Sequence, residues 1–391
     1  MLYHSNGNCA YRGKMIKGKK QGEGRQWHDN GVLFYEGNFC EDGPHGENCK
    51  LYHRNGSLMY VGEMICGKKE GKGKEYYDNN QIYFEGRYDN DGPDGQTCKV
   101  YYNSGSPKYS GSMLKGKFSG RGILYHEEGG SLVHYEGEFI DGKPDGEKCK
   151  LFHIDGKIMY EGAIKIGKKD GMGKEFHENG QLSYEGHYQN NFPDSDYCEL
   201  WQVNGFLSYV GALKMGVKNG RGIEYYEDGI RKTEGEYVNN KMEGDYCVVY
   251  YKNGSLLYIG QMKEGKKHGK GIEYYENGKI HRNGWFKDDM LDGRACKLYY
   301  RNTSVRFMGN VIKGVREGMG KYYHENGKMA FRGKFCSGGY DGKLCFMFNK
   351  NGGLEFVGCM VKGTRQGYGK EFRDDGTVYF QGEYNNDEDI F

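Results

Sequence analysis

Residues 60–73 read YVGEMICGKKEGKG, and their opening element, an aromatic residue followed by any residue and then glycine, recurs along the whole chain. Successive copies start 24 to 26 residues apart, which makes fifteen complete repeats. Such a fixed period is the signature of a repeat protein. The copies begin at Tyr11, Tyr35, Tyr60, Phe84, Tyr109, Tyr135, Tyr160, Tyr184, Tyr209, Thr233, Tyr258, Arg282, Phe307, Phe331, Phe356 and Phe380.

Two types of repeat alternate. Residues 60–73 represent the first type, and residues 135–152, YEGEFIDGKPDGEKCKLF, represent the second. The first type continues into Gly-x-Gly, whereas the second has a cysteine-containing segment in its place. The true period is therefore a pair of repeats, about 49 residues.

Each repeat predicts two β-strands. In the first strand Tyr35, Gly37 and Phe39 stand at alternate positions, which places them on one face of a sheet. Asn-Gly and Asp-Gly pairs supply the turns, and glycine recurs too often for stable helices. We therefore predict an all-β fold, an elongated single-layer antiparallel sheet of about fifteen tandem β-hairpin repeats that forms a twisted rod.

The repeats also set the expected domain organisation. Residues 1–10 form an N-terminal half-repeat, residues 11–379 hold fifteen repeats in alternating pairs, and residues 380–391 form a C-terminal half-repeat with an acidic tail. Half-repeats suit the ends of an array, which need capping. We expect the tail from residue 385 onward to be frayed, and we see no linker and no second domain.

The composition fits a thin, aromatic-rich β-structure. Apolar residues make up 36% of the 391, aromatic residues make up 15%, and there are 67 glycines. The aromatic content argues against disorder, and the lack of a Gly-X-Y period argues against collagen. No apolar stretch is long enough for a membrane helix, and the first residues lack a secretory signal. We expect an intracellular, cytoplasmic protein whose twelve cysteines are all thiols.

The pattern resembles the MORN repeat, with residues 184–186 and 160–173 among the closest matches. Segments such as Tyr-Tyr-Glu-Asn-Gly also resemble the MORN-variant repeats of some bacterial proteins. The resemblance implies a rod of stacked hairpins. It further implies a scaffold at membrane–cytoskeleton junctions or in cilia, with phosphoinositide binding or self-association in several members. Some members carry an enzyme domain beside the repeats, and this chain has no residues left for one.

One cysteine recurs in each repeat pair. Successive copies lie four strands apart, roughly 19 Å, which is too far for a disulfide or a shared zinc ion. We interpret these thiols as small apolar groups of the inner face. The column comprises Cys49, Cys98, Cys149, Cys198, Cys247, Cys296 and Cys345.

Seven histidines follow the aromatic residue of the second strand and are interpreted as exposed polar positions beside a turn, since neighbouring copies are too far apart for one metal ion. They are His4, His28, His53, His126, His153, His177 and His324. No phosphate-binding loop and no catalytic motif is present. We expect no catalytic residue, no metal and no cofactor.

Charge differs between the two repeat types. The first turn is basic in the first type and acidic or neutral in the second, as in residues 41–43. Mixed charge at an edge is explained by solubility alone, but it also suits an anionic surface or a partner with complementary charge. The candidate binding residues are Lys19, Lys20, Lys68, Lys69, Lys117, Lys168, Lys169, Lys218, Lys266, Lys267, Arg316 and Arg365.

Three functions remain open from the sequence. The first is a non-catalytic scaffold for protein partners, including a second copy of the chain. The second is a membrane adaptor that binds anionic phospholipids through the basic turns, and the third is a regulatory protein like the bacterial antitoxins with MORN-variant repeats. Nucleic acid is not expected as a partner, because the net charge is only +2.

The repeat pattern predicts the length of the molecule in solution. Fifteen repeats of two strands at about 4.8 Å per strand give a rod roughly 145 Å long, shortened somewhat by twist. Small-angle X-ray scattering should therefore show a particle with one dimension far longer than the others. A compact particle of ordinary radius for this chain length would exclude the repeat interpretation.

Overall fold

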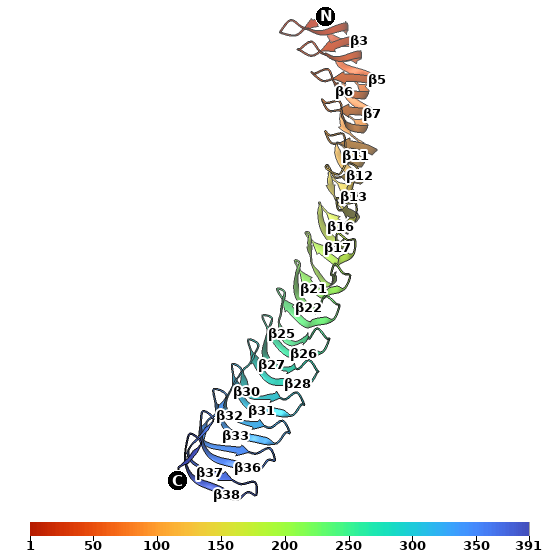
Figure 1. Cartoon of the computed structure of the whole chain (residues 1–391). Helices are drawn as coiled ribbons and strands as arrows, with labels where there is room; N and C mark the ends of the chain where they lie inside the picture. The colour runs from red at the N-terminus through yellow and green to blue at the C-terminus, as the bar shows by residue number, and fades with distance from the viewer. Residues whose placement is uncertain (391) are drawn as a thin grey trace. The chain divides into compact units, whose positions relative to one another are not determined.

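The computed structural model describes residues 1–390 and contains no helix in that range. The chain divides into two compact units, Met1–Pro193 (unit 1) and Asp194 onward (unit 2). Each unit is an antiparallel sheet in which the long strands pair in chain order (Figure 1). Short strands such as β9 pair only with the strand before them, so that β10 pairs with β8. The predicted all-β sheet of tandem hairpins is confirmed in each unit.

The strands of unit 1 are β1 (Leu2–Tyr3), β2 (Cys9–Ile16), β3 (Lys19–Trp27), β4 (Leu33–Cys40), β5 (Gly43–Tyr52), β6 (Leu58–Ile65), β7 (Lys68–Tyr76), β8 (Ile82–Asp89), β9 (Gly92–Pro93), β10 (Gly95–Tyr101), β11 (Pro107–Leu114), β12 (Lys117–Tyr125), β13 (Val133–Ile140), β14 (Lys143–Pro144), β15 (Gly146–Phe152), β16 (Ile158–Lys165), β17 (Lys168–Phe176), β18 (Leu182–Gln189) and β19 (Phe192–Pro193).

The strands of unit 2 are β20 (Ser195–Trp201), β21 (Leu207–Lys214), β22 (Val217–Tyr225), β23 (Arg231–Val238), β24 (Lys241–Met242), β25 (Gly244–Tyr250), β26 (Leu256–Lys263), β27 (Lys266–Tyr274), β28 (Ile280–Lys287), β29 (Met290–Leu291), β30 (Gly293–Tyr299), β31 (Val305–Ile312), β32 (Val315–Tyr323), β33 (Met329–Cys336), β34 (Gly339–Tyr340), β35 (Gly342–Phe348), β36 (Leu354–Val361), β37 (Thr364–Phe372), β38 (Val378–Asn385) and β39 (Glu388–Ile390).

The opening aromatic ring of each repeat of the first type lies flat across paired glycines. Gly62 of β6 pairs with Gly73 of β7, and Gly73 pairs in turn with Gly86 of β8. A Cβ atom on Gly73 would stand only 2.5 Å from the Tyr60 hydroxyl, so only glycine fits under the ring. The Tyr60 hydroxyl donates to the Glu63 carbonyl oxygen at 2.9 Å. This satisfies the phenol although the residue is fully buried.

The buried rings of the two repeat types alternate along the inner face, the face that carries the opening tyrosines. The rings of Tyr60 and Tyr88 meet edge to face with centroids 5.5 Å apart, and Phe84 meets Tyr88 in the same way at 5.0 Å. The rings thus form one cluster in each repeat pair, and the series of clusters along the inner face is here called the aromatic ladder. The repeated cysteine lies in the same layer, since Cys98 is opposite Gly111 and fully buried.

A lysine and a glutamate complete each aromatic cluster. Lys69 Nζ lies 5.2 Å from the centre of the Tyr60 ring and 5.3 Å from that of Tyr88, and it forms an ion pair with Glu75 at 2.7 Å. The other Glu75 oxygen accepts a hydrogen bond of 3.0 Å from the Tyr88 hydroxyl. Cation–π attraction is stronger where water is largely excluded, and the Lys69 side chain is only 18% exposed.

The same cluster recurs in other repeat pairs, and one copy replaces both charges together. Lys169 with Glu175 and Lys218 with Glu224 repeat the arrangement over their own ring pairs. In β12, however, Phe118 stands at the lysine position and stacks on Tyr109 with centroids 3.9 Å apart. The glutamate position of that copy is occupied by Leu124, which pairs with Tyr109 across the strands. Where a ring replaces the cation, its carboxylate is replaced as well, whereas Lys20 and Arg316 keep the cation beside the uncharged Gln26 and Tyr322.

The second turns of successive repeats are joined to one another. Asn30 Nδ2 donates to the Arg54 carbonyl of the next repeat at 2.8 Å, and Asn55 Nδ2 does the same to Asp78 at 3.0 Å. The Asn-Gly pairs supply the turns as predicted. In these two turns the glycine of the pair takes the positive φ, and the asparagine bonds the next turn.

Two expectations from the sequence are wrong in detail. The histidines were interpreted as exposed, but His28 is half-buried, and its Nε2 lies 2.9 Å from the Tyr52 carbonyl oxygen of the next repeat. Tyr77 makes the equivalent bond to the Tyr101 carbonyl at 2.9 Å, so this column joins repeats. The tail was expected to fray, but the backbone of β39 pairs with β38; Phe391 lies outside the described residues.

The paired replacement of lysine and glutamate predicts the effect of mutations. Lys69→Ala should destabilise unit 1 by about 1–3 kcal/mol, because it leaves the half-buried Glu75 carboxylate without its cation. Lys69→Phe combined with Glu75→Leu reproduces the Phe118–Leu124 arrangement and should restore most of the loss. Chemical denaturation of the three variants measures this. Equal destabilisation by the single and double changes would contradict the role of the cluster.

The buried tyrosines predict loss of stability at alkaline pH. Burial raises the pKa of Tyr60 and Tyr88 well above the ordinary value, and it raises the pKa of Tyr237 to about 12. The unfolded chain titrates near pH 10, so tyrosine burial stabilises the fold fully below that pH. The stability is lost as the pH rises from the unfolded towards the folded pKa. The tyrosinate absorbance of the buried tyrosines should therefore appear together with the loss of the circular dichroism signal, as a step separate from that of the exposed tyrosines.

Candidate binding surface

The face opposite the aromatic ladder, here called the open face, carries no side chains at its glycine columns. Backbone at Gly62, Gly73 and Gly86 forms the floor of a hollow of about 1020 Å³ in unit 1. Further hollows of the same kind lie over the glycines of β2–β4 and of β11–β16. Residues at the glycine positions point to the inner face, so the hollows form a groove that is bounded by the open-face side chains on either side of the glycines.

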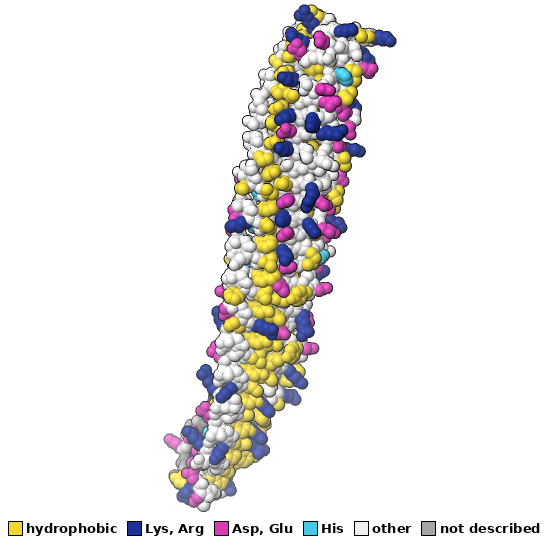
Figure 2. Space-filling view, turned by 90° about the vertical axis from the view of Figure 1, so that its right-hand side faces the viewer, with side chains coloured by type: hydrophobic (Ala, Val, Ile, Leu, Met, Phe, Trp, Pro, Cys, Tyr) yellow, Lys and Arg dark blue, Asp and Glu magenta, His cyan; other side chains and the backbone are white. Residues whose placement is uncertain are grey.

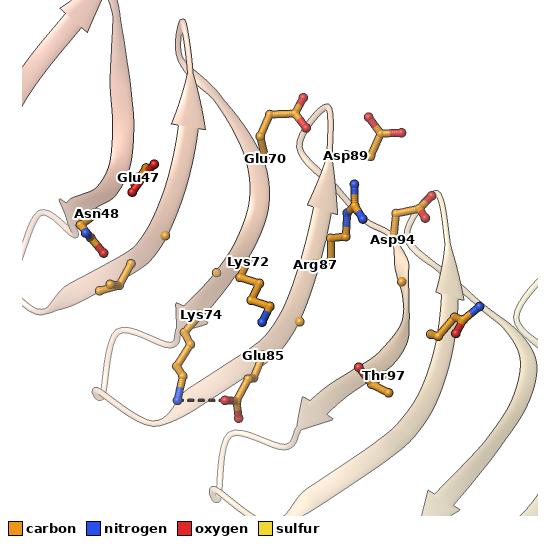
Figure 3. Close-up of a pocket in the computed structure, with 16 residues that line it drawn as sticks. Glu47, Asn48, Glu70, Lys72, Lys74, Glu85, Arg87, Asp89, Asp94 and Thr97 are labelled. Atoms are coloured by element: carbon orange, nitrogen blue, oxygen red, sulfur yellow. Dashed lines mark ion pairs between the residues drawn. The ribbon is translucent and has the colours of Figure 1, made fainter.

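Charged side chains line the groove of unit 1. Lys74 and Glu85 form an ion pair of 2.9 Å across one side of the hollow over Gly62, Gly73 and Gly86, and Lys72 and Arg87 stand opposite each other in register (Figure 3). Lys174 pairs with Glu185 at the equivalent position, at 3.1 Å. Exposed pairs of this kind contribute little to stability, so they are available to exchange partners. Basic and acidic side chains lie next to one another along unit 1 in Figure 2.

The open face of unit 2 has a different character. Large apolar side chains project from it and are mostly exposed, and Tyr246 is 65% exposed. Some of them directly precede the repeated cysteine, others are the middle residue of a Gly-x-Gly segment, and one lies in β28. The set comprises Tyr197, Tyr246, Trp285, Met319, Leu344 and Tyr368. In unit 1 the position before the cysteine holds Asn48, Thr97 and Lys148, so the two units differ there, whereas the exposed Met172 of unit 1 is equivalent to Met319.

The predicted basic residues separate into two groups. Seven are half-buried, and they lie over rings of the inner face: Lys20, Lys69, Lys169, Lys218, Lys267, Arg316 and Arg365. The other five are exposed at the turns: Lys19, Lys68, Lys117, Lys168 and Lys266. Neighbouring residues of a strand point to opposite faces, which separates Lys68 from Lys69.

The exposed lysines lie next to residues of the following turn. Lys19 Nζ pairs with Glu41 at 3.3 Å, and Lys117 pairs with Asp141 at 3.3 Å. Lys68 Nζ donates to the Asn90 side chain at 2.8 Å. Part of the positive charge of this edge is therefore neutralised locally. Binding to an anionic surface stays a prediction, and it depends on these five side chains.

The repeated cysteines are buried, and each is a free thiol. Cys149 accepts a hydrogen bond of 3.0 Å from Tyr135, and burial raises the pKa of Cys198 to about 12. Thiols of such high pKa react slowly, because the thiolate is the reactive form. Their place beside the glycine columns agrees with a packing role.

One pair of cysteines corrects the prediction that all twelve are thiols. Cys40 at the end of β4 and Cys66 in the turn after β6 form a disulfide, with their Cα atoms 4.7 Å apart. The prediction rested on an intracellular location, and its spacing argument covered only the seven cysteines of one column. It missed that neighbouring first turns approach each other closely: a Cβ atom on Gly43 would meet the Cα atom of Gly67 at 2.4 Å. His45 of β5 lies beside the pair.

The stacked hairpins and the open face define a tandem β-hairpin repeat protein, and sequence comparisons identify the family. The MORN repeat matches residues 60–82, 109–131, 135–147, 209–231, 234–255, 258–280 and 356–378. The MORN repeat variant matches residues 20–41, 169–190 and 316–336. The chain belongs to the MORN-repeat family.

Comparison with individual proteins gives no relative from which a function could be inferred. No curated protein matches this sequence. Among solved structures, virginiamycin B lyase from Staphylococcus aureus is 8% identical, with 73% of this chain and 83% of that chain covered and a TM-score of 0.13. The TcdB2-TccC3 structure without its hypervariable C-terminal region is 10% identical, with 94% and 20% covered and a TM-score of 0.16. Likeness this low supports no inference.

No helix in residues 1–390 has the length and apolar character that a membrane crossing requires.

Proposed function

We propose that this protein is a non-catalytic scaffold that binds protein partners on its open face. The observation that carries the proposal is the set of exposed aromatic and aliphatic side chains on the open face of unit 2, including Tyr246, Met319 and Leu344. The inner face already contains the aromatic ladder, so these side chains are not needed for the core. Aromatic residues and methionine are enriched at protein interfaces, and such anchors supply most of the binding energy.

Charged residues between the anchors favour a protein over a lipid partner. Glu236 and Glu383 are exposed on the same face of unit 2, and Lys270 lies over the Trp285 ring, 5.6 Å from its centre. Carboxylates among the apolar groups would be repelled by an anionic membrane and would lose hydration in its interior. A protein segment can match both kinds of group, with apolar side chains at the anchors and polar groups at the charges.

Unit 1 suits a partner segment that is rich in charge. Its groove holds cross-strand ion pairs at Lys74–Glu85 and Lys174–Glu185. An incoming segment with charges of both signs would replace these exposed pairs with pairs across the interface. Complementary charge of this kind mainly increases association rate and specificity. We infer that the two open faces bind segments of different composition.

A face-directed variant tests the protein-scaffold proposal. In the native cell, proximity labelling with the wild-type chain should mark a reproducible set of proteins. In the triple variant Tyr246→Ser, Met319→Ser and Leu344→Ser, the labelling of at least some of these proteins should fall tenfold or more. The reason is that truncation of a hot-spot side chain costs about 2 kcal/mol or more of binding free energy. The matched control changes Met215, Val238 and Ile312, which are exposed at the turns and strand ends of unit 2, to Ser. Identical labelling by all three chains would contradict the proposal.

The phosphoinositide-adaptor alternative is tested on the exposed lysines alone. Changing Lys19, Lys68, Lys117, Lys168 and Lys266 to Glu should abolish sedimentation with phosphoinositide-containing liposomes if these turns bind lipid together by avidity. The fold should be unaffected, because exposed charges contribute little to stability. Unchanged sedimentation, or none for the wild-type chain, would leave protein binding as the function.

A further inference from the structure

One place in unit 1 combines two cysteines and a histidine at three neighbouring positions, and no later repeat pair has this combination. The residue at the end of the first strand is Cys40, whereas Asp89 and Ile140 occupy the same place in the next repeat pairs. The first-turn residue of the next hairpin is Cys66, where Lys115 stands one pair later. The position of His45 is acidic in every later copy: Asp94, Asp145, Asp194, Glu243, Asp292 and Asp341.

The acidic residue of the later copies has a structural role that His45 also fulfils. The Asp145 carboxylate accepts a hydrogen bond of 3.0 Å from the Ile166 backbone N–H, and Glu243 accepts one of 2.8 Å from Glu264. His45 Nδ1 lies 3.4 Å from the Cys66 backbone nitrogen and takes the same place. A carboxylate is therefore sufficient to accept the hydrogen bond from the backbone N–H of this turn. The need for that bond does not explain why this copy has an imidazole between two thiols.

The three side chains bring metal-binding atoms together. The Cys40 and Cys66 sulfur atoms and a His45 ring nitrogen all lie within 4.8 Å of one another. Ligands of one tetrahedral zinc ion stand about 3.5–4 Å apart, since each bond is about 2.0–2.3 Å long. Small side-chain rotations would complete that geometry. The backbone beneath is held by the Gly67 N–H, which donates to the Pro44 carbonyl at 2.8 Å.

We propose that Cys40, His45 and Cys66 bind a zinc ion when the two cysteines are reduced. Two thiolates and one imidazole are a ligand set that favours zinc over magnesium or calcium. His45 and Cys66 are exposed, and Cys40 is half-buried. The fourth coordination position therefore faces solvent, where water or a side chain of another molecule completes the tetrahedron.

Zinc binding and the disulfide exclude each other. A dithiol reductant breaks the Cys40–Cys66 bond, its own two sulfurs form a disulfide, and two protein thiols remain. Binding of Zn²⁺ then releases the two thiol protons, because the thiolate is the ligand. The ion replaces the covalent link between two neighbouring first turns by a coordinated one, so the two turns stay joined in both states.

The experiment uses the full chain and Co²⁺ as a spectroscopic substitute for Zn²⁺. The chain is reduced, separated from the reductant without oxygen and titrated with CoCl₂. We expect thiolate-to-cobalt charge-transfer absorption and tetrahedral ligand-field bands that saturate at one ion per chain, and their loss when Zn²⁺ is added. The unreduced chain should show neither band.

Variants that copy other repeats distinguish this site from the remaining cysteines. Cys40→Ile and Cys66→Lys reproduce the residues found at Ile140 and Lys115 and should remove the bands while the fold is retained. His45→Asn keeps a hydrogen-bond acceptor for Cys66 and should weaken binding. Cys336→Ile changes an exposed cysteine at the position equivalent to Cys40 in another pair and should leave the spectrum unchanged. Absence of the bands in the reduced wild-type chain, or their persistence in the Cys40/Cys66 variant, would overturn the proposal.

Discussion

The fold depends on one contact, a tyrosine ring that lies across two glycines of adjacent strands. The ring of Tyr60 occupies the space that side chains at Gly62 and Gly73 would fill, and its hydroxyl reaches the Glu63 carbonyl within the same strand. Because a single layer has no second sheet to cover it, the ring itself must supply the core. A sheet with ordinary side chains at the glycine positions would lift the ring into solvent and expose the backbone beneath it.

Much of this contact could be predicted from the sequence, because it is local. The spacing of Tyr35, Gly37 and Phe39 places them on one face by the period of a strand alone. The spacing does not predict which residue of the next repeat each side chain contacts. The Asn30 and His28 side chains bond the backbone of the next repeat, and the residue that receives each bond lies 24 positions further on. Nothing in the local pattern identifies it.

The basic turns show how a composition-based interpretation can combine residues with different roles. Lys68 and Lys69 are adjacent in sequence and were treated as one charged loop. Within the strand they point to opposite sides, so Lys68 is exposed while Lys69 lies over two rings and pairs with Glu75. The signal that separates them was present in the sequence: Phe118 occupies the position of Lys69, and Leu124 that of Glu75. A position that accepts either a cation or a ring faces the aromatic ladder, not solvent.

The glycine columns also explain why the two units can differ on the open face. The inner face fixes the fold through the rings, the glycines and the thiols, and these recur in both units. Side chains between the glycines point the other way and take no part in that packing. They can therefore change from Thr97 and Lys148 in unit 1 to Tyr246 and Leu344 in unit 2 without disturbing the sheet. Variation on a face that the fold does not need suits a binding surface, because affinity for a partner can then change while stability is kept.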